Sequence, residues 1–157
     1  MAKTQFWVGV VSREHVQHGV ELGIAQLNHG KRAPLARMHQ GDWLVYYSPR
    51  TSYPEGEPLQ AFTAIGQITS AAPEQVEMLD DFHPYRHSVR YLSCREVPIR
   101  EVLADLAFLP DKQHWGARFR FGHLAVSATD FRIISQAMGV TISELEEGDE
   151  SLAFRAG

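Results

Sequence analysis

Runs and alternations of apolar residues predict a chain rich in β-strands. Residues 6–11 are almost continuously apolar, with the aromatic and β-branched side chains that are typical of a buried strand. Residues 43–48 and 62–68 have the same character and flank residues 49–58, a segment with three prolines and one glycine. We therefore expect an antiparallel pair of strands joined by a surface loop. Residues 87–97 alternate between apolar and polar or basic side chains and predict a further long strand.

Helices are expected only in the connections between strands. Ser12 can cap a helix that ends at Gly23, and Ser127 can cap a helix over residues 131–138. The spacing of apolar residues also favours a helix over residues 99–106. Because strands dominate and the helices are short, the predicted fold class is α+β, with a curled or partly closed sheet.

Length and composition set the domain organisation. A chain of 157 residues with 44% apolar and 22% charged residues fits one domain with an ordinary core. We expect this domain to span residues 1–142 and the acidic residues of 143–157 to form a disordered tail. The N-terminus does not resemble a signal segment, and no apolar run approaches the ~20 residues of a membrane span. A cytoplasmic protein without membrane contact is expected, with a monomer favoured.

The formal net charge of −4 is unevenly distributed along the chain. Residues 31–50 carry four basic side chains against one acidic side chain, and residues 83–100 carry the same balance. Residues 51–82 carry six acidic side chains and no basic one. This segregation permits a local basic face on an acidic protein, and scattered arginines in contact with solvent are the alternative.

The sequence offers little support for catalysis. Eight histidines are present, but no His-Glu-x-x-His motif, and the single cysteine, Cys94, excludes a zinc site built on cysteines. Cys94 lies in a strand pattern and is interpreted as a buried small residue. Neither a Gly-x-Ser-x-Gly motif nor a glycine-rich phosphate loop occurs. We therefore expect a binding protein without catalytic residues, metal or cofactor; a nuclease or base-processing hydrolase that uses His29 and acidic residues is the alternative.

Aromatic and basic residues are interleaved in three places, residues 46–48, 83–87 and 114–121. Flat rings stack on nucleobases, and arginines hold phosphates without reading sequence. Side chains alternate along a strand, so Tyr46 and Tyr47 must face opposite sides and at most one of them lines any one cavity. These groups favour nucleic acid as the partner, although some of the rings are expected in the core.

Several motifs follow one another between residues 5 and 140. They are an opening strand that ends in Ser12-Arg13-Glu14, the loop Gln26-x-x-His29-Gly30-Lys31 that continues to Gly41-Asp42, the strand end Val45-Tyr46-Tyr47-Ser48-Pro49, the strand Phe62-Thr63-Ala64-Ile65-Gly66, the strand entry Pro84-Tyr85-Arg86, and Asp111-Lys112-x-His114-Trp115-Gly116-x-x-Phe119. In this order and spacing they resemble the EVE-domain family, in its small stand-alone bacterial branch.

The resemblance implies a fold and a function. EVE domains share the PUA-like fold, a curled, barrel-like mixed sheet with short flanking helices, and are related to YTH and ASCH domains. The implied function is a pocket at the mouth of the sheet that accepts a modified base flipped from DNA or RNA. The residues that this resemblance places around the base are Ser12, Arg13, Gln26, His29, Lys31, Tyr47, Ser48, Tyr85, Arg86 and Trp115. Phosphates are expected at Arg90, Arg118 and Arg120, with Arg86 as a further candidate.

The chain departs from the family pattern in one loop. Eukaryotic-type EVE domains carry Trp-Asp/Glu-Gly-Val-Arg-Asn where this chain has Gly-Ile-Ala-Gln-Leu-Asn at residues 23–28. The tryptophan expected to stack on a base is therefore missing, and Trp7 and Trp115 are the candidates to replace it. A sensor of a free nucleobase or anion that uses the same pocket is the second function that the sequence leaves open.

Overall fold

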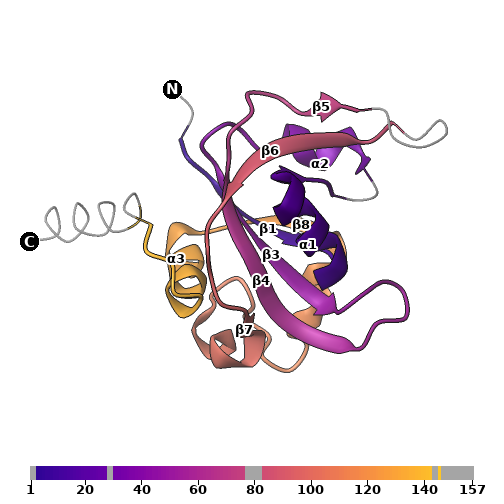
Figure 1. Ribbon diagram of the computed structural model, residues 1–157. Helices are drawn as coiled ribbons and strands as arrows, with labels where there is room; N and C mark the ends of the chain where they lie inside the picture. The colour runs from indigo at the N-terminus through magenta and orange to yellow at the C-terminus, as the bar shows by residue number, and fades with distance from the viewer. Residues whose placement is uncertain (1–2, 28–29, 77–82, 143–144, 146–157) are drawn as a thin grey trace, which may run out of the picture.

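The computed structural model describes residues 3–27, 30–76, 83–142 and Leu145 (Figure 1). Its strands form one mixed sheet that curls into a half-barrel, with short helices on both sides. The strands are β1 (Phe6–Val10), β2 (Ile24–Ala25), β3 (Trp43–Arg50), β4 (Pro58–Ile68), β5 (Glu74–Gln75), β6 (Tyr85–Tyr91), β7 (Val97–Pro98) and β8 (His123–Val126). The helices are α1 (Arg13–Leu22), α2 (Arg32–Ala36) and α3 (Ala128–Ala137), with 3₁₀ helices η2 (Ile99–Glu101), η3 (Leu103–Asp105) and η4 (Trp115–Phe121).

The strand order across the sheet is β2-β6-β4-β3-β1-β8, while β5 pairs with β6 and β7 pairs with β4. Strand β1 runs parallel to β3, and the other pairs are antiparallel. Two parallel neighbours need a long crossover connection. The chain supplies it with α1, β2 and α2, which therefore lie together over one face of the sheet.

Two clusters of buried apolar side chains lie on the two faces. Val45 and Tyr47 belong to the larger cluster, with α3 and the 3₁₀ helices, whereas Leu44 and Tyr46 belong to the smaller cluster beneath α1 and α2. Figure 1 shows α3 and α1 on opposite sides of β3 and β4. The prediction that Tyr46 and Tyr47 face opposite sides is confirmed.

The predicted helix starts are also confirmed. The Ser12 hydroxyl accepts a hydrogen bond from the backbone N–H of His15, and α1 ends at Gly23, whose φ of 67° suits a residue without a side chain. The hydroxyl of Ser127 caps α3 by accepting from Asp130 N. This helix begins at Ala128, three residues before the predicted start.

Three differences from the sequence predictions lie in the second half of the chain. Strand β6 ends at Tyr91; the N–H of Leu92 still bonds the carbonyl of Ile65 on β4, and beyond it the N–H of Arg95 bonds the carbonyl of Met138 instead of a strand. The predicted helix over residues 99–106 is two 3₁₀ turns, η2 and η3. Strand β8 was not predicted from its sequence; it pairs with β1 along the edge of the sheet.

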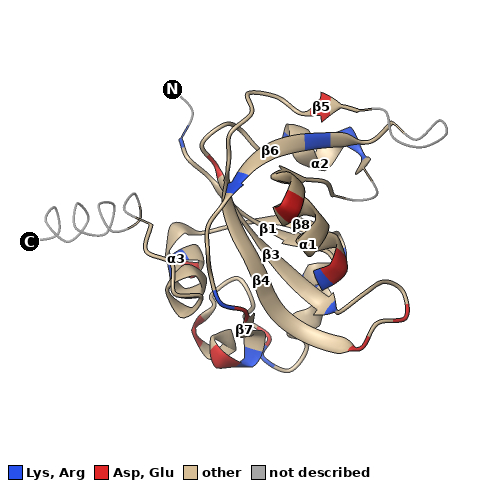
Figure 2. Cartoon of the chain, in the orientation of Figure 1, with Lys and Arg blue, Asp and Glu red and all other residues tan. Residues whose placement is uncertain are grey.

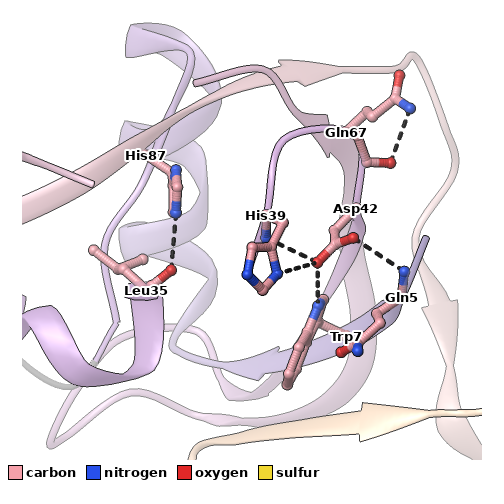
Figure 3. Close-up of polar contacts among 8 residues, drawn as sticks. Gln5, Trp7, Leu35, His39, Asp42, Gln67 and His87 are labelled. Atoms are coloured by element: carbon pink, nitrogen blue, oxygen red, sulfur yellow. Dashed lines mark hydrogen bonds and ion pairs between the residues drawn. The ribbon is translucent and has the colours of Figure 1, made fainter. Parts of the chain in front are cut away.

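A buried carboxylate holds the turn before β3 (Figure 3). Asp42 accepts hydrogen bonds from Gln5 N at 3.0 Å, from Trp7 Nε1 at 3.0 Å and from His39 N at 2.9 Å. The side-chain amide of Gln67 donates to Gly41 O in the same turn. Asp42 therefore ties the start of β1 to the start of β3, which are neighbours in the sheet.

The C-terminal part of the described chain packs on the larger cluster. Ile142 and Leu145 are buried there, while most of the predicted acidic tail, residues 143–144 and 146–157, lies outside the described residues. Among the helices that the structure describes, none is long and apolar enough to cross a membrane.

Candidate binding site

The N-terminus of α1, the end of β3 and the segment after β2 meet at one end of the half-barrel. The ring Nε2 of His15 lies 3.2 Å from the carbonyl oxygen of Gln26. The N–H of Val11 donates to Tyr47 O, and the N–H of Glu14 donates to Thr51 O. We call Ser12, His15 and Gln26 the α1 rim. All three side chains are partly exposed, and the side-chain amide of Gln26 makes no hydrogen bond within the described ranges.

The rim continues into a basic face. Strand β2 pairs with β6 in the register Ile24↔Ser88 and Ala25↔His87, so Gln26 follows beside Arg86. Helix α2 packs against the face of β6 from which His87 points. Figure 2 shows one basic residue of β6 near the basic residues of α2 and the acidic residue of β5, while the other basic residue of β6 lies at the far end of that strand. We define the basic face by four side chains, Lys31, Arg32, Arg86 and Arg90.

These four side chains come from the two basic segments of the sequence. Lys31, Arg32 and Arg90 are exposed and Arg86 is half-buried. Arg90 donates to Gln67 Oε1 on β4, and Arg86 pairs in register with Glu74 of β5. The two basic segments of the sequence thus lie beside one another in the fold, on α2 and β6.

A buried histidine fixes α2 against β6. His87 Nε2 lies 2.8 Å from Leu35 O (Figure 3), and its Nδ1 lies 2.7 Å from the hydroxyl of Ser70. Because Leu35 O can only accept, Nε2 carries the proton and Nδ1 accepts from Ser70. Burial lowers the pKa of His87, since desolvation disfavours its charged form. The neutral ring therefore acts as a clamp that positions Lys31 and Arg32.

Tyr47 and Trp115 do not join the rim, which corrects their predicted grouping with it. The ring of Tyr47 stacks on Phe119 at 4.1 Å and 12°, and Trp115 lies edge-on to Tyr47 at 6.2 Å. Both rings belong to the larger cluster on the opposite face of the sheet from α1. Strand alternation is the reason, because Tyr46 points under α1 and its neighbour must point away.

Ser48 lies next to a bulge in the sheet. Between Tyr46 and Tyr47 the register shifts, so that Thr63 is the extra residue of β4. Its hydroxyl lies 2.8 Å from the hydroxyl of Ser48. Bulges of this kind re-aim side chains next to binding sites. Ser48 is fully buried, and its hydroxyl is hydrogen-bonded to that of Thr63.

A groove of about 660 Å³ lies along another side of α1. Its walls come from α1, from β4 and from residues 91–96, and it is lined by Arg13, Val16, Gln17, Val20, Glu21, Thr63, Ala64, Tyr91, Leu92, Ser93, Cys94 and Glu96. Arg13 forms a two-pronged ion pair with Glu96, at 2.6 and 3.0 Å. The structure therefore places Arg13 at the groove, on a different side of α1 from His15.

The remaining predicted residues lie in separate places. Tyr85 is half-buried on the inner side of β6, opposite in direction to its neighbour Arg86. Arg118 and Arg120 are exposed on η4. His29 lies outside the described residues.

Neither candidate for the missing tryptophan lines the rim. Trp7 is 3% exposed, donates its indole N–H to Asp42, and stacks on His123 at 4.6 Å and 14°. Arg37 covers Trp7, with its guanidinium carbon 5.2 Å from the ring centre. Trp115 packs in the larger cluster, as described above.

The titratable groups of the described residues are not gathered into a metal site. Over the ranges that the structure describes, no three histidine, cysteine or acidic side chains are close enough to hold a metal ion. Cys94 is half-buried beside the groove, where burial raises the pKa of its thiol. A raised pKa leaves the thiol protonated and weakly nucleophilic at neutral pH.

His123 makes folding stability sensitive to acid. Burial, with the charge of Arg37 beside it, lowers the pKa of His123 to about 4. Neither ring nitrogen has a hydrogen-bond partner in the described part of the chain. A histidine in the unfolded chain has a pKa near 6.5. Between about pH 6.5 and pH 4 the unfolded chain therefore binds a proton at this position and the folded chain does not, which favours unfolding. The contribution of His123 to the free energy of unfolding is therefore fully present above about pH 6.5 and is lost progressively as the pH falls to about 4.

We expect His123→Phe to remove part of this loss. A phenyl ring preserves the stack on Trp7 and does not titrate, so at pH 5 the variant should avoid a loss of about 2 kcal/mol in the free energy of unfolding. Urea unfolding at pH 7 and pH 5 measures the difference, with the exposed His18→Phe as the control. Equal losses in the wild type and His123→Phe would refute the assignment.

The family model of the EVE domain matches residues 5–137 of this chain. The chain belongs to the EVE family. Its relatives include the "UPF0310 protein" of Mycolicibacterium vanbaalenii, 52% identical over 132 residues that cover 84% of this chain and 91% of that protein. The "UPF0310 protein YdcG" of Bacillus subtilis is 47% identical over 140 residues, with 89% and 96% covered. The predicted family is therefore confirmed.

Solved structures share the fold of this EVE domain at low identity. The YTH domain of the Zygosaccharomyces rouxii MRB1 protein, determined in complex with N6-methyladenosine RNA, has a TM-score of 0.56 at 18% identity, with 87% of each chain covered. Rpa0253 of Rhodopseudomonas palustris has a TM-score of 0.52 at 18% identity, with 87% of this chain and 94% of that chain covered. The predicted PUA-like fold is confirmed.

Sequence reasoning missed three residues of this EVE domain that shape the site. His15 joins α1 to Gln26, and its position three residues after the cap Ser12 was the available signal. Arg32 follows Lys31 directly and belongs to the same basic segment. Glu96 pairs with Arg13 across 83 positions of sequence, and no local pattern indicates such a pair.

Proposed function

We propose that this EVE domain is a non-enzymatic nucleic-acid-binding module that receives one base, in modified form, at the α1 rim. The phosphates beside that base lie on the basic face. The observation that carries the proposal is the continuity of the two surfaces, since Gln26 of the rim follows β2 beside Arg86 of the basic face. A base and its own phosphate are neighbours in any strand, so a base site needs a cationic neighbour.

The basic face has the chemistry of a phosphate contact. Guanidinium and ammonium groups from Lys31, Arg32, Arg86 and Arg90 project from one helix and one strand that are clamped together by His87. Such contacts position a strand without reading its sequence. They also release counterions from the nucleic acid, which makes binding depend on salt.

The rim has the chemistry of a base contact. The Gln26 amide offers a donor and an acceptor, the Ser12 hydroxyl retains its own proton after accepting from His15 N, and the His15 ring has a second nitrogen. Groups of this kind can bond the edge of a base that is turned out of its stack.

Binding of short single strands tests the proposal. We expect an eight-nucleotide strand with a central modified base to bind more tightly than its unmodified counterpart, in DNA or RNA form, because the rim hydrogen-bonds the base edge. We expect log K to fall by about 0.7 per decade of salt for each phosphate held. Fluorescence anisotropy from 20 to 200 mM salt, with N6-methyladenine and 5-methylcytosine strands, measures both effects. Absence of binding to every strand at low salt would overturn the proposal.

The groove favours a second candidate, a sensor of a free nucleobase. Its volume of about 660 Å³ lies in the range of small-molecule sites, and Val16, Val20 and Leu92 give it apolar walls. Two glutamates against one arginine make it a poor place for a phosphate. A free nucleoside that raises the melting temperature while no strand binds would favour this candidate over the first.

A further inference from the structure

The 3₁₀ helix η4 presents an aromatic and basic outer side to solvent. Phe121 is 72% exposed, although it is a large apolar residue, and Arg118 and Arg120 are exposed beside it. In a 3₁₀ helix, side chains three positions apart lie above one another. Trp115, Arg118 and Phe121 have this spacing; Trp115 is partly buried against the larger cluster, whereas Arg118 and Phe121 are exposed and follow one another along the outer side of η4.

The inner side of η4 is firmly packed. Phe119 stacks on Tyr47 and lies edge-on to Phe108 at 6.0 Å. Trp115 packs edge-on against both Tyr47 and Phe119. Gly122 ends the helix with a φ of 74°, which an ordinary side chain disfavours. Phe121 is therefore held outward by a rigid element, so a ligand that stacks on it has little backbone disorder to overcome.

The end of η4 lies beside the α1 rim. The carbonyl of Gly122 accepts from Val10 N at 2.9 Å, and Ser12 follows two residues later. The rim thus has the basic face on its Gln26 side and η4 on its Ser12 side. Between Asp111 and Asp130 the chain has no acidic residue but has Lys112, Arg118 and Arg120.

We propose that the outer side of η4 is a second contact for a single-stranded nucleic acid, in which Phe121 stacks on a base next to the one held at the rim and Arg118 and Arg120 hold its phosphates. This inference rests on the proposed function and extends it to a strand of several nucleotides. Exposed rings on basic surfaces bind successive bases without sequence preference, because every base has a flat face. The positive charge of η4 favours a polyanion over a neutral partner.

Strand length separates this proposal from the function on which it rests. We expect Phe121→Ala to weaken binding of an eight-nucleotide strand about tenfold, and to leave a dinucleotide that fills only the rim unchanged. Phe121→Trp should restore tight binding, because it restores a flat ring. Leu22→Ala, which removes another exposed apolar side chain from the end of α1, is the matched control and should have no effect.

The outcomes are distinct. Equal affinity of the wild type and Phe121→Ala for the long strand would overturn the η4 contact and leave the proposed function standing. A wild type that binds neither strand would overturn both. A poly-glutamate peptide that competes as well as the strand, and depends on Phe121, would overturn nucleic acid as the occupant. Tenfold weakening for the long strand alone supports the contact.

Discussion

Replacing Asp42 by alanine should lower the free energy of unfolding by about 3–4 kcal/mol. The carboxylate is 2% exposed and accepts three N–H groups, from Gln5, Trp7 and His39. The substitution leaves these donors without their acceptor, including the buried indole N–H of Trp7. Asp42→Asn should cost less, because its one carbonyl oxygen can still accept. Urea unfolding followed by tryptophan fluorescence measures both values.

The control for Asp42 is an exposed acid of the same type. Asp105 lies on η3, and its carboxylate takes part in no hydrogen bond or ion pair of the described residues. Asp105→Ala should change the free energy of unfolding by less than about 0.5 kcal/mol. A loss below about 1 kcal/mol for Asp42→Ala would show that the turn does not depend on this carboxylate.

Local patterns were sufficient to predict much of the fold. The caps Ser12 and Ser127 were recognisable because a hydroxyl that bonds an N–H three residues later is a short-range feature. Strands β1, β3 and β4 were recognisable because their apolar runs are buried on both faces. Family resemblance supplied the PUA-like closure, which no single run of residues indicates.

Contacts between distant segments account for the errors. Residues 92–96 have a strand pattern, but the N–H of Arg95 is satisfied by Met138, 43 positions away in sequence. Strand β8 is only four residues long and follows a 3₁₀ helix, so its pairing with β1 decides its conformation. The hydroxyl of Ser48 pairs with that of Thr63 at a bulge, and a bulge depends on the register of two strands.

In the candidate site, too, local patterns were predictable from the sequence and contacts between distant segments were not. The charge pattern permitted a basic face from residues 31–50 and 83–100, but only the packing of α2 on β6 brings the two segments together. Tyr47 and Trp115 satisfied the aromatic pattern of a base site. They pack with Phe119 instead, because the face of the sheet on which a ring lies is decided by alternation from its neighbours.

Removing two charges from the basic face should weaken nucleic-acid binding more than any other surface change. The double variant Lys31→Gln, Arg86→Gln deletes one contact from α2 and one from β6 on the two sides of the His87 clamp. We expect affinity for an eight-nucleotide strand at 50 mM salt to fall at least tenfold. The slope of log K against log salt should become shallower by about 1.4, because two phosphates are no longer neutralised.

The direct test of the central claim is this salt slope, measured by anisotropy on the wild type, the double variant and a matched control. The control Lys3→Gln, Arg100→Gln removes the same charge from two exposed residues, at the N-terminus and on η2. Our account predicts a shallower slope and weaker binding for the basic-face variant, with the control close to wild type. Identical slopes for both variants would mean that net charge alone attracts the strand, and would contradict a phosphate contact on α2 and β6.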